Sequence, residues 1–311
     1  MIKSNLHYFN YSIKHKESLD TRYMFLLPDK DINKYIDTTK SIKEYLTTIK
    51  VLENKGNNAD EIYKDLFNLS KTKYASKSEL NCFINACDSA TSTIKDINIF
   101  KEIIQLYFKH REFNTESTPA EWIQAIIDKG SSRGSGSLGE DKLVDLAIQQ
   151  DFIFTDNWDD FLNIDKAIAK FSKNNFDLNN VKTKLGIDLN FNSQGKMLDI
   201  IFKNRDNFMF IEAKHLKEGG GSQDKQIKEL IDIIAKTPNK NNVYYGAFLD
   251  GVYSNILLDI TEENISNPNT MNKLGNNKVT SQKIDIIKTL SQNSTSFWFN
   301  TAGITEFLKD F

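Results

Sequence analysis

The chain has 311 residues, of which 39% are hydrophobic and 26% are charged, and its formal net charge is −2. This composition excludes wholesale disorder, and the length suits one large domain or two ordinary ones. A charge so close to zero also excludes nucleic-acid binding through a general positive field, so such a partner would need a locally basic surface.

The sequence has neither an apolar signal core at its N-terminus nor a run of 18 apolar residues. We therefore expect no membrane span and a cytoplasmic location. Cys82 and Cys87 do not have the spacing of a disulfide framework or a zinc site.

Residues 1–127 are predicted to form a mostly helical N-terminal region. Apolar residues recur at helical spacing in this region. A helix start is predicted near residue 118, where Thr, Pro and Glu occupy the N-cap, first and third positions. The predicted helices cover residues 41–49, 59–69, 97–108 and 118–127.

Residues 128–311 are predicted to form an α/β domain, because helical and strand patterns alternate after the glycine- and serine-rich segment 130–139. Residues 261–281 contain many Asn residues and are predicted to form an exposed loop. The predicted helices are 140–150, 222–236 and 304–311, and the predicted strands are 196–203, 207–214, 242–249 and 296–300.

The main chemical signal lies in the two consecutive strands, which carry Asp199 on the first and Glu212 and Lys214 on the second. Side chains two apart on a strand share a face, so Glu212 and Lys214 point the same way. A hairpin with a turn at 204–207 would place Asp199 beside Glu212, at about 5 Å.

These acids are unusual because the strands around them are apolar on both faces, as in a buried sheet. A buried carboxylate must be neutralised, paired or bound to metal. Two adjacent carboxylates form a hard-oxygen site that suits Mg²⁺. The alternative is a salt-bridge cluster of Lys, Glu and Asp at the end of the sheet.

Two further segments carry candidate site residues. Glu140 lies in the first turn of its predicted helix, where the helix dipole favours a negative charge, and precedes the apolar stripe of that helix. The segment Gly219-Gly220-Gly221 leads into the helix 222–236, with Ser222 as its expected N-cap. This helix start would hold a phosphate or be a flexible connection. Ser222 is a candidate for contacting DNA, and Gln223 and Gln226 are candidates for contacting DNA or bracing the site.

The order of these acids and the lysine resembles that of the PD-(D/E)XK nuclease superfamily, specifically its type II restriction endonucleases. The resemblance covers roughly residues 130–311, with Asp199 and Glu212 matching the two acids of the motif and Lys214 its lysine. Glu140 matches the helix acid that many members carry. Leu198 departs from the motif, which has proline at that position.

The resemblance implies a restriction-endonuclease-like core with a mixed central sheet flanked by helices. It implies sequence-specific hydrolysis of double-stranded DNA that leaves 5′-phosphate ends, with one or two Mg²⁺ held by Asp199, Glu212 and the carbonyl of Ala213. Lys214 would orient or deprotonate the attacking water, or stabilise charge on phosphorus. It also implies a homodimer and a cognate DNA methyltransferase in a restriction–modification system. The helical region 1–127 would then serve DNA recognition or dimerisation.

Other assignments stay open. Arg133 in the glycine-serine segment and the segment 261–281 are candidates for reading the DNA sequence, and each is also an ordinary solvated loop. His215 is expected on the sheet face opposite Lys214, in a structural role. The alternatives to a restriction enzyme are a repair or structure-specific nuclease on the same fold, a catalytically silent DNA-binding protein and a protein-interaction module.

Overall fold

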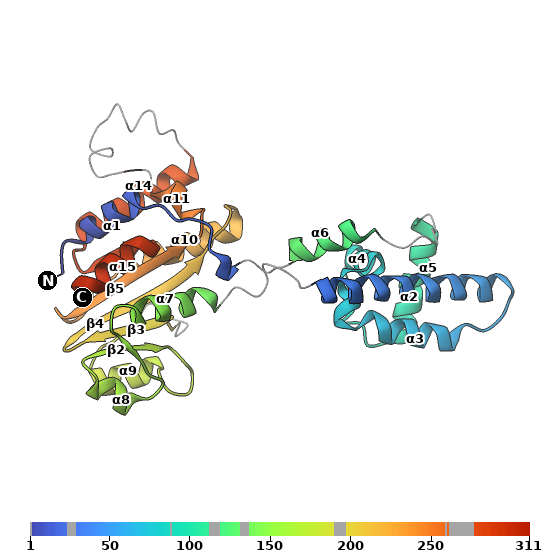
Figure 1. Ribbon diagram of the computed structural model, residues 1–311, viewed down its shortest axis with the longest axis horizontal. Coiled ribbons are helices and arrows are strands. Elements are labelled where there is room, and N and C mark those ends of the chain that lie inside the picture. Colours follow the sequence, from blue (N-terminus) through green and yellow to red (C-terminus); the bar gives the residue numbers. More distant parts are fainter. Residues whose placement is uncertain are drawn as a thin grey trace. The chain divides into compact units, whose positions relative to one another are not determined.

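The computed structural model describes residues 2–23, 29–87, 89–111, 119–130, 137–189, 197–258, 260 and 277–311. The chain divides into two compact units (Figure 1). Residues 1–23 and 134–311 form the first, called here the sheet unit, and residues 24–133 form the second, called the helical unit.

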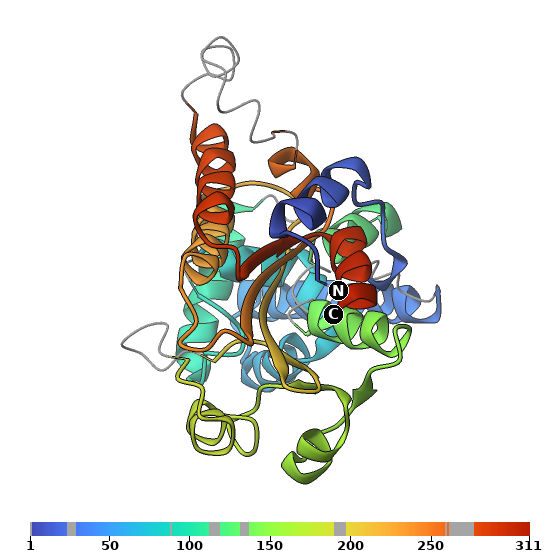
Figure 2. The ribbon, with the colours of Figure 1, turned by 90° about the vertical axis from the view of Figure 1, so that its left-hand side faces the viewer.

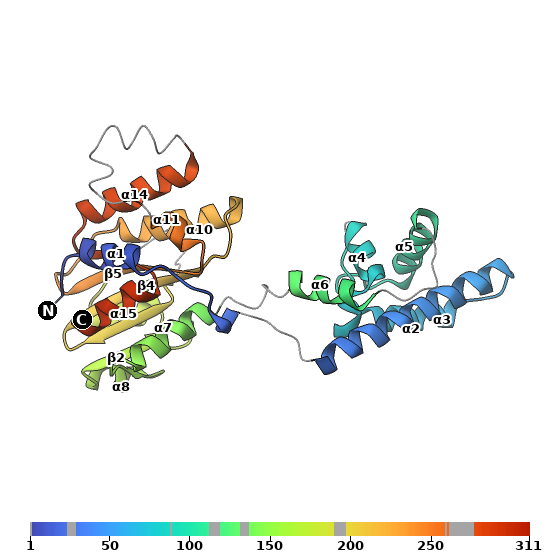
Figure 3. The same ribbon diagram turned by 45° about the horizontal axis from the view of Figure 1, so that its top comes forward.

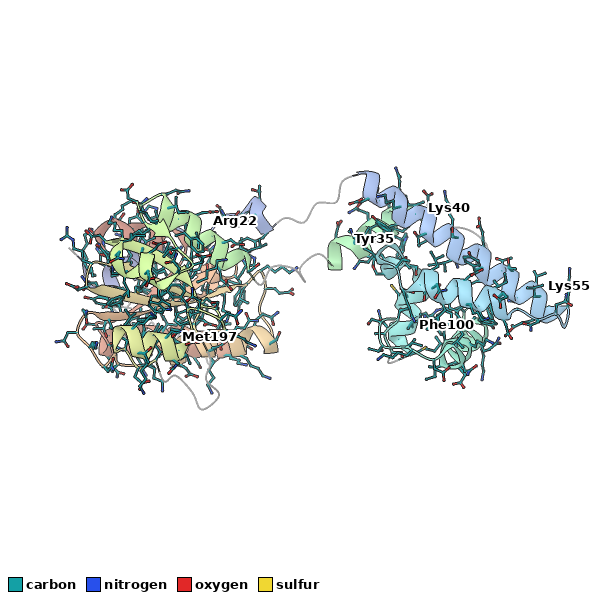
Figure 4. The ribbon with its side chains drawn as sticks, turned by 90° about the horizontal axis from the view of Figure 1, so that it is seen from below. Arg22, Tyr35, Lys40, Lys55, Phe100 and Met197 are labelled. Carbon is teal, nitrogen blue, oxygen red and sulfur yellow. The ribbon has the colours of Figure 1, made fainter. Side chains whose placement is uncertain are left out.

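The described residues of the helical unit form a large apolar core and a smaller one, in which Tyr35 of its first long helix packs against Ile123 and Ile127. Its longest helix is α2 (Asp29–Asn54), which lies alongside α3 (Asp60–Ser70), as Figure 3 shows. Lys55 lies in the turn between them, and fully buried Phe100 of α5 packs inside (Figure 4). The other elements are η2 (Lys73–Lys77), α4 (Glu79–Ala86), α5 (Ile97–His110) and α6 (Ala120–Gly130). The helical prediction for these segments is confirmed, although Thr118 lies outside the described residues.

The sheet unit is built on one mixed sheet, whose strands among the described residues follow the order β1-β2-β3-β4-β5-β6. Strands β2, β3 and β4 are antiparallel neighbours, whereas β1 is parallel to β2, β5 to β4 and β6 to β5. The strands are β1 (Ile153–Phe154), β2 (Lys166–Lys170), β3 (Ile200–Asn204), β4 (Asn207–His215), β5 (Val243–Asp250) and β6 (Ser296–Phe299).

Helices cover both faces of this sheet, which explains why its central strands are apolar on both sides. Figure 2 shows α10 (Gly221–Ile234) and α14 (Lys278–Gln292) on one side, and α7 (Leu138–Ile148) and α15 (Thr301–Asp310) on the other. Shorter elements are η1 (Thr21–Tyr23), α8 (Trp158–Asn163), α9 (Leu178–Leu185) and α11 (Ser254–Leu257). The expected α/β class with a mixed sheet flanked by helices is thus confirmed.

The first residues of the chain belong to the sheet unit, so the predicted single region 1–127 needs correction at this end. Helix α1 (Asn5–Lys14) packs against β6 and α15. Asn5 donates side-chain hydrogen bonds to the carbonyls of Leu290, Asn293 and Ser296. These contacts span almost the whole sequence, and no local pattern predicts them.

A second correction concerns the predicted loop 261–281. Residues 261–276 lie outside the described part of the chain, but Asn277 caps α14 by accepting a hydrogen bond from the N–H of Thr280. The helix therefore begins at Lys278, inside the predicted loop. Among the described residues, no helix is both long and apolar enough to cross a membrane.

Asn300 is the principal polar link between α1 and the end of β6. Its side chain is fully buried, accepts from Gly303 N–H at the start of α15, and donates to the carbonyls of Ser12 and His15.

We predict that Asn300→Ala lowers the free energy of unfolding by about 2–3 kcal/mol, because a helix cap and two buried hydrogen bonds are lost. Urea denaturation measures the change. Asn157→Ala, at the exposed N-cap of α8, is the control and should cost about 1 kcal/mol; equal losses in the two variants would contradict this account.

Candidate active site

The hairpin of β3 and β4 places Asp199 across from Glu212. Ile200 pairs with Ile211 and Asn204 with Asn207, so the chain turns at Arg205 and Asp206. Asp199 lies just before β3 and donates its N–H to the carbonyl of Ile211 at 3.0 Å. The predicted strand 196–203 therefore begins later, at Ile200, but the predicted pairing of the two acids agrees with this register.

The Asp199 carboxylate is largely buried and tied to the backbone of β4. Its Oδ2 accepts a hydrogen bond from the N–H of Ala213 at 2.8 Å. Burial, and then the nearby Glu212 carboxylate, raise the pKa of Asp199 to about 6, although the Ala213 N–H and the Lys214 ammonium act in the opposite direction. A second positive charge in this place would relieve the repulsion between the two acids.

Glu212 and Lys214 face α10, as their spacing on β4 predicts. The Glu212 side chain is 1% exposed, and its Oε1 accepts a hydrogen bond from the Lys214 ammonium. The same ammonium lies 3.7 Å from Oε2 of Glu229 on α10. Lys214 is 20% exposed. The ammonium is therefore held between two carboxylates while part of the side chain still reaches solvent.

Glu140 lies in the first turn of α7, so its predicted helical position is confirmed. Its Oε2 is 3.6 Å from the Lys170 ammonium of β2. Burial raises the pKa of Glu140, partly offset by Lys170, and the charge of Glu212 adds to the rise. Glu140 thus belongs to the same electrostatic environment as the acids of the hairpin.

A pocket of about 460 Å³ lies beside these groups; Asp199 and Lys214 line it, whereas Glu212 and Glu140 do not. Among the described residues its lining includes Gln226 but not Ser222 or Gln223. Arg133 lies outside the described residues. The lining residues are Gly139, Asp199, Ala213, Lys214, His215, Gln226 and Glu229.

The prediction that Ser222 caps α10 is wrong. Gly220 occupies the N-cap position with φ of +157°, a conformation that side chains rarely adopt, so the helix begins one residue earlier, at Gly221. Ser222 is exposed and donates its hydroxyl to Gln223 Oε1. Glu229 is a pocket residue that the sequence analysis missed, although its spacing of three residues from Gln226 puts both on one helix face.

His215 also lines the pocket. The sequence analysis expected it on the opposite sheet face in a structural role and did not predict this position. Its ring stacks on Tyr23 with 3.6 Å between centroids, and its Nδ1 lies 3.6 Å from Oδ2 of Asp250 on β5. Strand β4 ends at His215, so the pocket reaches around the strand end and meets both faces of the sheet.

A buried ion cluster lies behind His215. The Lys142 ammonium of α7 is 2.9 Å from Asp250 Oδ1, 3.0 Å from Asp20 Oδ2 and 3.9 Å from Glu17 Oε2. Burial alone would raise the pKa of Asp250, but His215 and Lys142 outweigh it and hold this pKa well below its usual range. Asp250 is therefore a fixed negative charge beside the histidine.

The donor set fits a hard divalent cation. Within the described residues no three His, Cys, Asp or Glu side chains are arranged to hold a metal ion. Mg²⁺ does not require three, because it is commonly held by one or two carboxylates and keeps several waters. Asp199 and Glu212 supply two carboxylates whose mutual repulsion a cation would offset. The carbonyl of Ala213, a pocket residue, is the additional oxygen expected from the sequence.

The raised pKa of Asp199 gives a test that does not require activity. The folded protein disfavours the ionised form, so the metal-free protein should lose stability as the pH rises from about 4 through about 6. We predict that Asp199→Asn removes this loss and makes the metal-free protein about 1–3 kcal/mol more stable than the wild type at about pH 8.

Urea denaturation in EDTA at several pH values measures this difference. The control is Asp206→Asn in the exposed hairpin turn, which should leave the pH dependence unchanged. Mg²⁺ should stabilise the wild type but not Asp199→Asn. If Asp199→Asn were less stable than the wild type at about pH 8 without metal, the ionised Asp199 carboxylate would not destabilise the folded protein, and this account would be contradicted.

Comparison of the chain with protein-family models, with curated proteins and with solved structures found no match in any of the three.

Proposed function

We propose that this protein is a Mg²⁺-dependent endonuclease that hydrolyses phosphodiester bonds of double-stranded DNA, as type II restriction endonucleases do. The observation that carries the proposal is that Asp199 and Lys214 line one pocket, while the nearly fully buried Glu212 contacts the Lys214 ammonium and, together with burial, raises the pKa of Asp199. A salt-bridge cluster with a purely structural role would not require the largely buried Asp199 carboxylate and Lys214 to line a pocket.

The sequence resemblance adds support to this reading. The mixed sheet flanked by helices is the coarse architecture that the resemblance implies. The Glu212 carboxylate also contributes to the raised pKa of the helix acid Glu140, so the two acids interact electrostatically. By the same resemblance we propose sequence-specific cleavage, a homodimer, a cognate methyltransferase and a cytoplasmic restriction–modification system.

In this proposal the protein holds its cation with Asp199, Glu212 and the Ala213 carbonyl. A bound Mg²⁺ would lower the pKa of a water and withdraw charge from the phosphate. Lys214 is placed beside the carboxylates with its ammonium in the pocket, where it can donate to the attacking water or to a phosphate oxygen. Water attack on phosphorus then breaks the bond to the 3′ oxygen, which leaves as a hydroxyl, and the 5′ end keeps the phosphate.

Plasmid cleavage tests the proposal. The purified chain should convert supercoiled DNA to linear fragments in Mg²⁺, stop when EDTA is added, and resume when Mg²⁺ is restored in excess. Digestion of genomic DNA and sequencing of the ends should give one recurring site. Failure to cut in Mg²⁺ or Mn²⁺ on both plasmid and genomic DNA would refute the proposal, and a gel shift on the same DNA would then show whether the chain is a silent DNA binder.

A further inference from the structure

The His215 ring is fixed by contacts from two segments far from it in the sequence. Tyr23, from the N-terminal segment, stacks on it with an interplanar angle of 16°. Gly251 follows β5 with φ of +90°, and a Cβ there would collide with the carbonyl of Leu216 and come 2.9 Å from Cε1 of His215. Only glycine therefore leaves room for the ring at this position.

Asp250 determines which ring nitrogen can meet a ligand. It is 1% exposed and is held by Lys142 and by the N–H of Gly251, which donates to its Oδ1 at 2.6 Å. The other oxygen, Oδ2, lies 3.6 Å from His215 Nδ1, and both atoms are buried without a hydrogen-bond partner among the described residues. A small rotation of the ring would form this hydrogen bond. Because Nδ1 is directed at Asp250, Nε2 is the nitrogen left for the pocket.

A histidine kept only for packing would not need this arrangement. Buried polar groups are costly unless they are satisfied, yet the chain buries an aspartate and a lysine directly behind the histidine that lines the pocket. Carboxylates that fix the orientation of a histidine are typical of sites in which the other nitrogen acts on a ligand.

We propose that His215 is a further substrate-contacting residue. With a proton on each ring nitrogen, it donates from Nδ1 to Asp250 and from Nε2 to a phosphodiester oxygen of the bound DNA, while Asp250 and Tyr23 are positioning residues. This inference rests on the proposed nuclease function. It adds a contact from the α7 side of β4 to the carboxylates and lysine on the α10 side. The phosphate would then be held from both sides of the strand end.

Two substitutions of His215 separate the contact from the packing. Glutamine can place an amide N–H near the position of Nε2, whereas asparagine places its amide near Nδ1, where it can meet Asp250 but cannot reach the pocket. We expect His215→Asn to lower the single-turnover cleavage rate about 10- to 100-fold, the range expected for loss of one hydrogen bond to a charged group. His215→Gln should lose less than about 5-fold.

The positioning role has its own pair of variants. Tyr23→Phe keeps the stacked ring and should cleave at nearly the wild-type rate, whereas Tyr23→Ala removes the stack and should lose about as much as His215→Asn. His7→Asn, on the exposed face of α1, is the matched control and should leave the rate unchanged. Should His215→Asn melt well below the wild type, the Tyr23 pair makes the same comparison.

The outcomes distinguish this inference from the proposed function. If the wild type cleaves DNA and His215→Asn cleaves at the same rate, the role of His215 is overturned but the proposed nuclease function stands. Equal rates in the asparagine and glutamine variants have the same consequence. The same holds for Tyr23→Ala cleaving at the rate of Tyr23→Phe. A wild-type chain that does not cleave at all overturns both.

Discussion

Glu212→Gln should reduce DNA cleavage in Mg²⁺ by about 1,000-fold or more, the scale of losing a group that stabilises charge in the transition state. The substitution removes one of the two carboxylates proposed to hold the cation while keeping nearly the same shape. Because Glu212 is 1% exposed and contacts the Lys214 ammonium, the change also frees that ammonium from its nearest carboxylate. The measurement is the single-turnover cleavage rate of a plasmid.

Binding should respond differently from cleavage. When Ca²⁺ replaces Mg²⁺, Glu212→Gln should still shift DNA in a gel. Glu44→Gln, on the exposed face of α2, is the matched control and should cleave at the wild-type rate. Cleavage by Glu212→Gln within about 10-fold of the wild type would remove Glu212 from the site, because loss of a charge-stabilising group should cost more.

The second large effect concerns stability. Lys142→Met should lower the free energy of unfolding by about 3–5 kcal/mol, because it removes the ammonium from three carboxylates. Two of them, Glu17 and Asp250, have side chains only 4% and 1% exposed. Burial raises the pKa of Glu17, so lowering the pH should recover part of the loss as this carboxyl takes up a proton.

Urea denaturation measures this effect, and Lys182→Met is its control. Lys182 pairs with Asp188 at 2.7 Å, but both side chains are exposed, so this loss should stay below about 1 kcal/mol. The double variant Lys142→Met with Asp250→Asn should be more stable than Lys142→Met alone, because it leaves one buried charge fewer. A loss for Lys142→Met as small as that of the control would contradict the view that this ammonium organises the cluster.

Much of the sheet unit could be predicted because its signals are local. Apolar strands such as 243–250 and the hairpin 200–215 follow from residue type and alternation. The spacing of Glu212 and Lys214 gives their common face. The same reasoning could place Asp199 opposite Glu212 but could not give the exact start of β3. The backbone of Asp199 departs from the regular pairing pattern of the hairpin, because its N–H donates to Ile211, so the strand begins only at Ile200.

The rest depends on contacts between segments far apart in the sequence. Lys142 meets Asp250 across 108 residues, and Tyr23 meets His215 across most of the chain. Alternation on β4 put His215 opposite Lys214, but alternation says nothing about a pocket that bends around a strand end. The prediction of Ser222 as a helix cap was wrong for a local reason. Gly220 adopts a backbone conformation that lets the helix begin one residue earlier, at Gly221.

The most direct test of the central claim is the chemistry of the ends that the protein makes. A plasmid should be cut by the wild-type chain in Mg²⁺ in water enriched with oxygen-18, and the fragment ends analysed by mass spectrometry. Water attack at a site built from Asp199, Glu212 and Lys214 predicts one labelled oxygen on each 5′-phosphate and unlabelled 3′-hydroxyls, with no product from the Asp199→Ala chain. Ends carrying 3′-phosphates, unlabelled 5′-phosphates, or equal cutting by Asp199→Ala would contradict it.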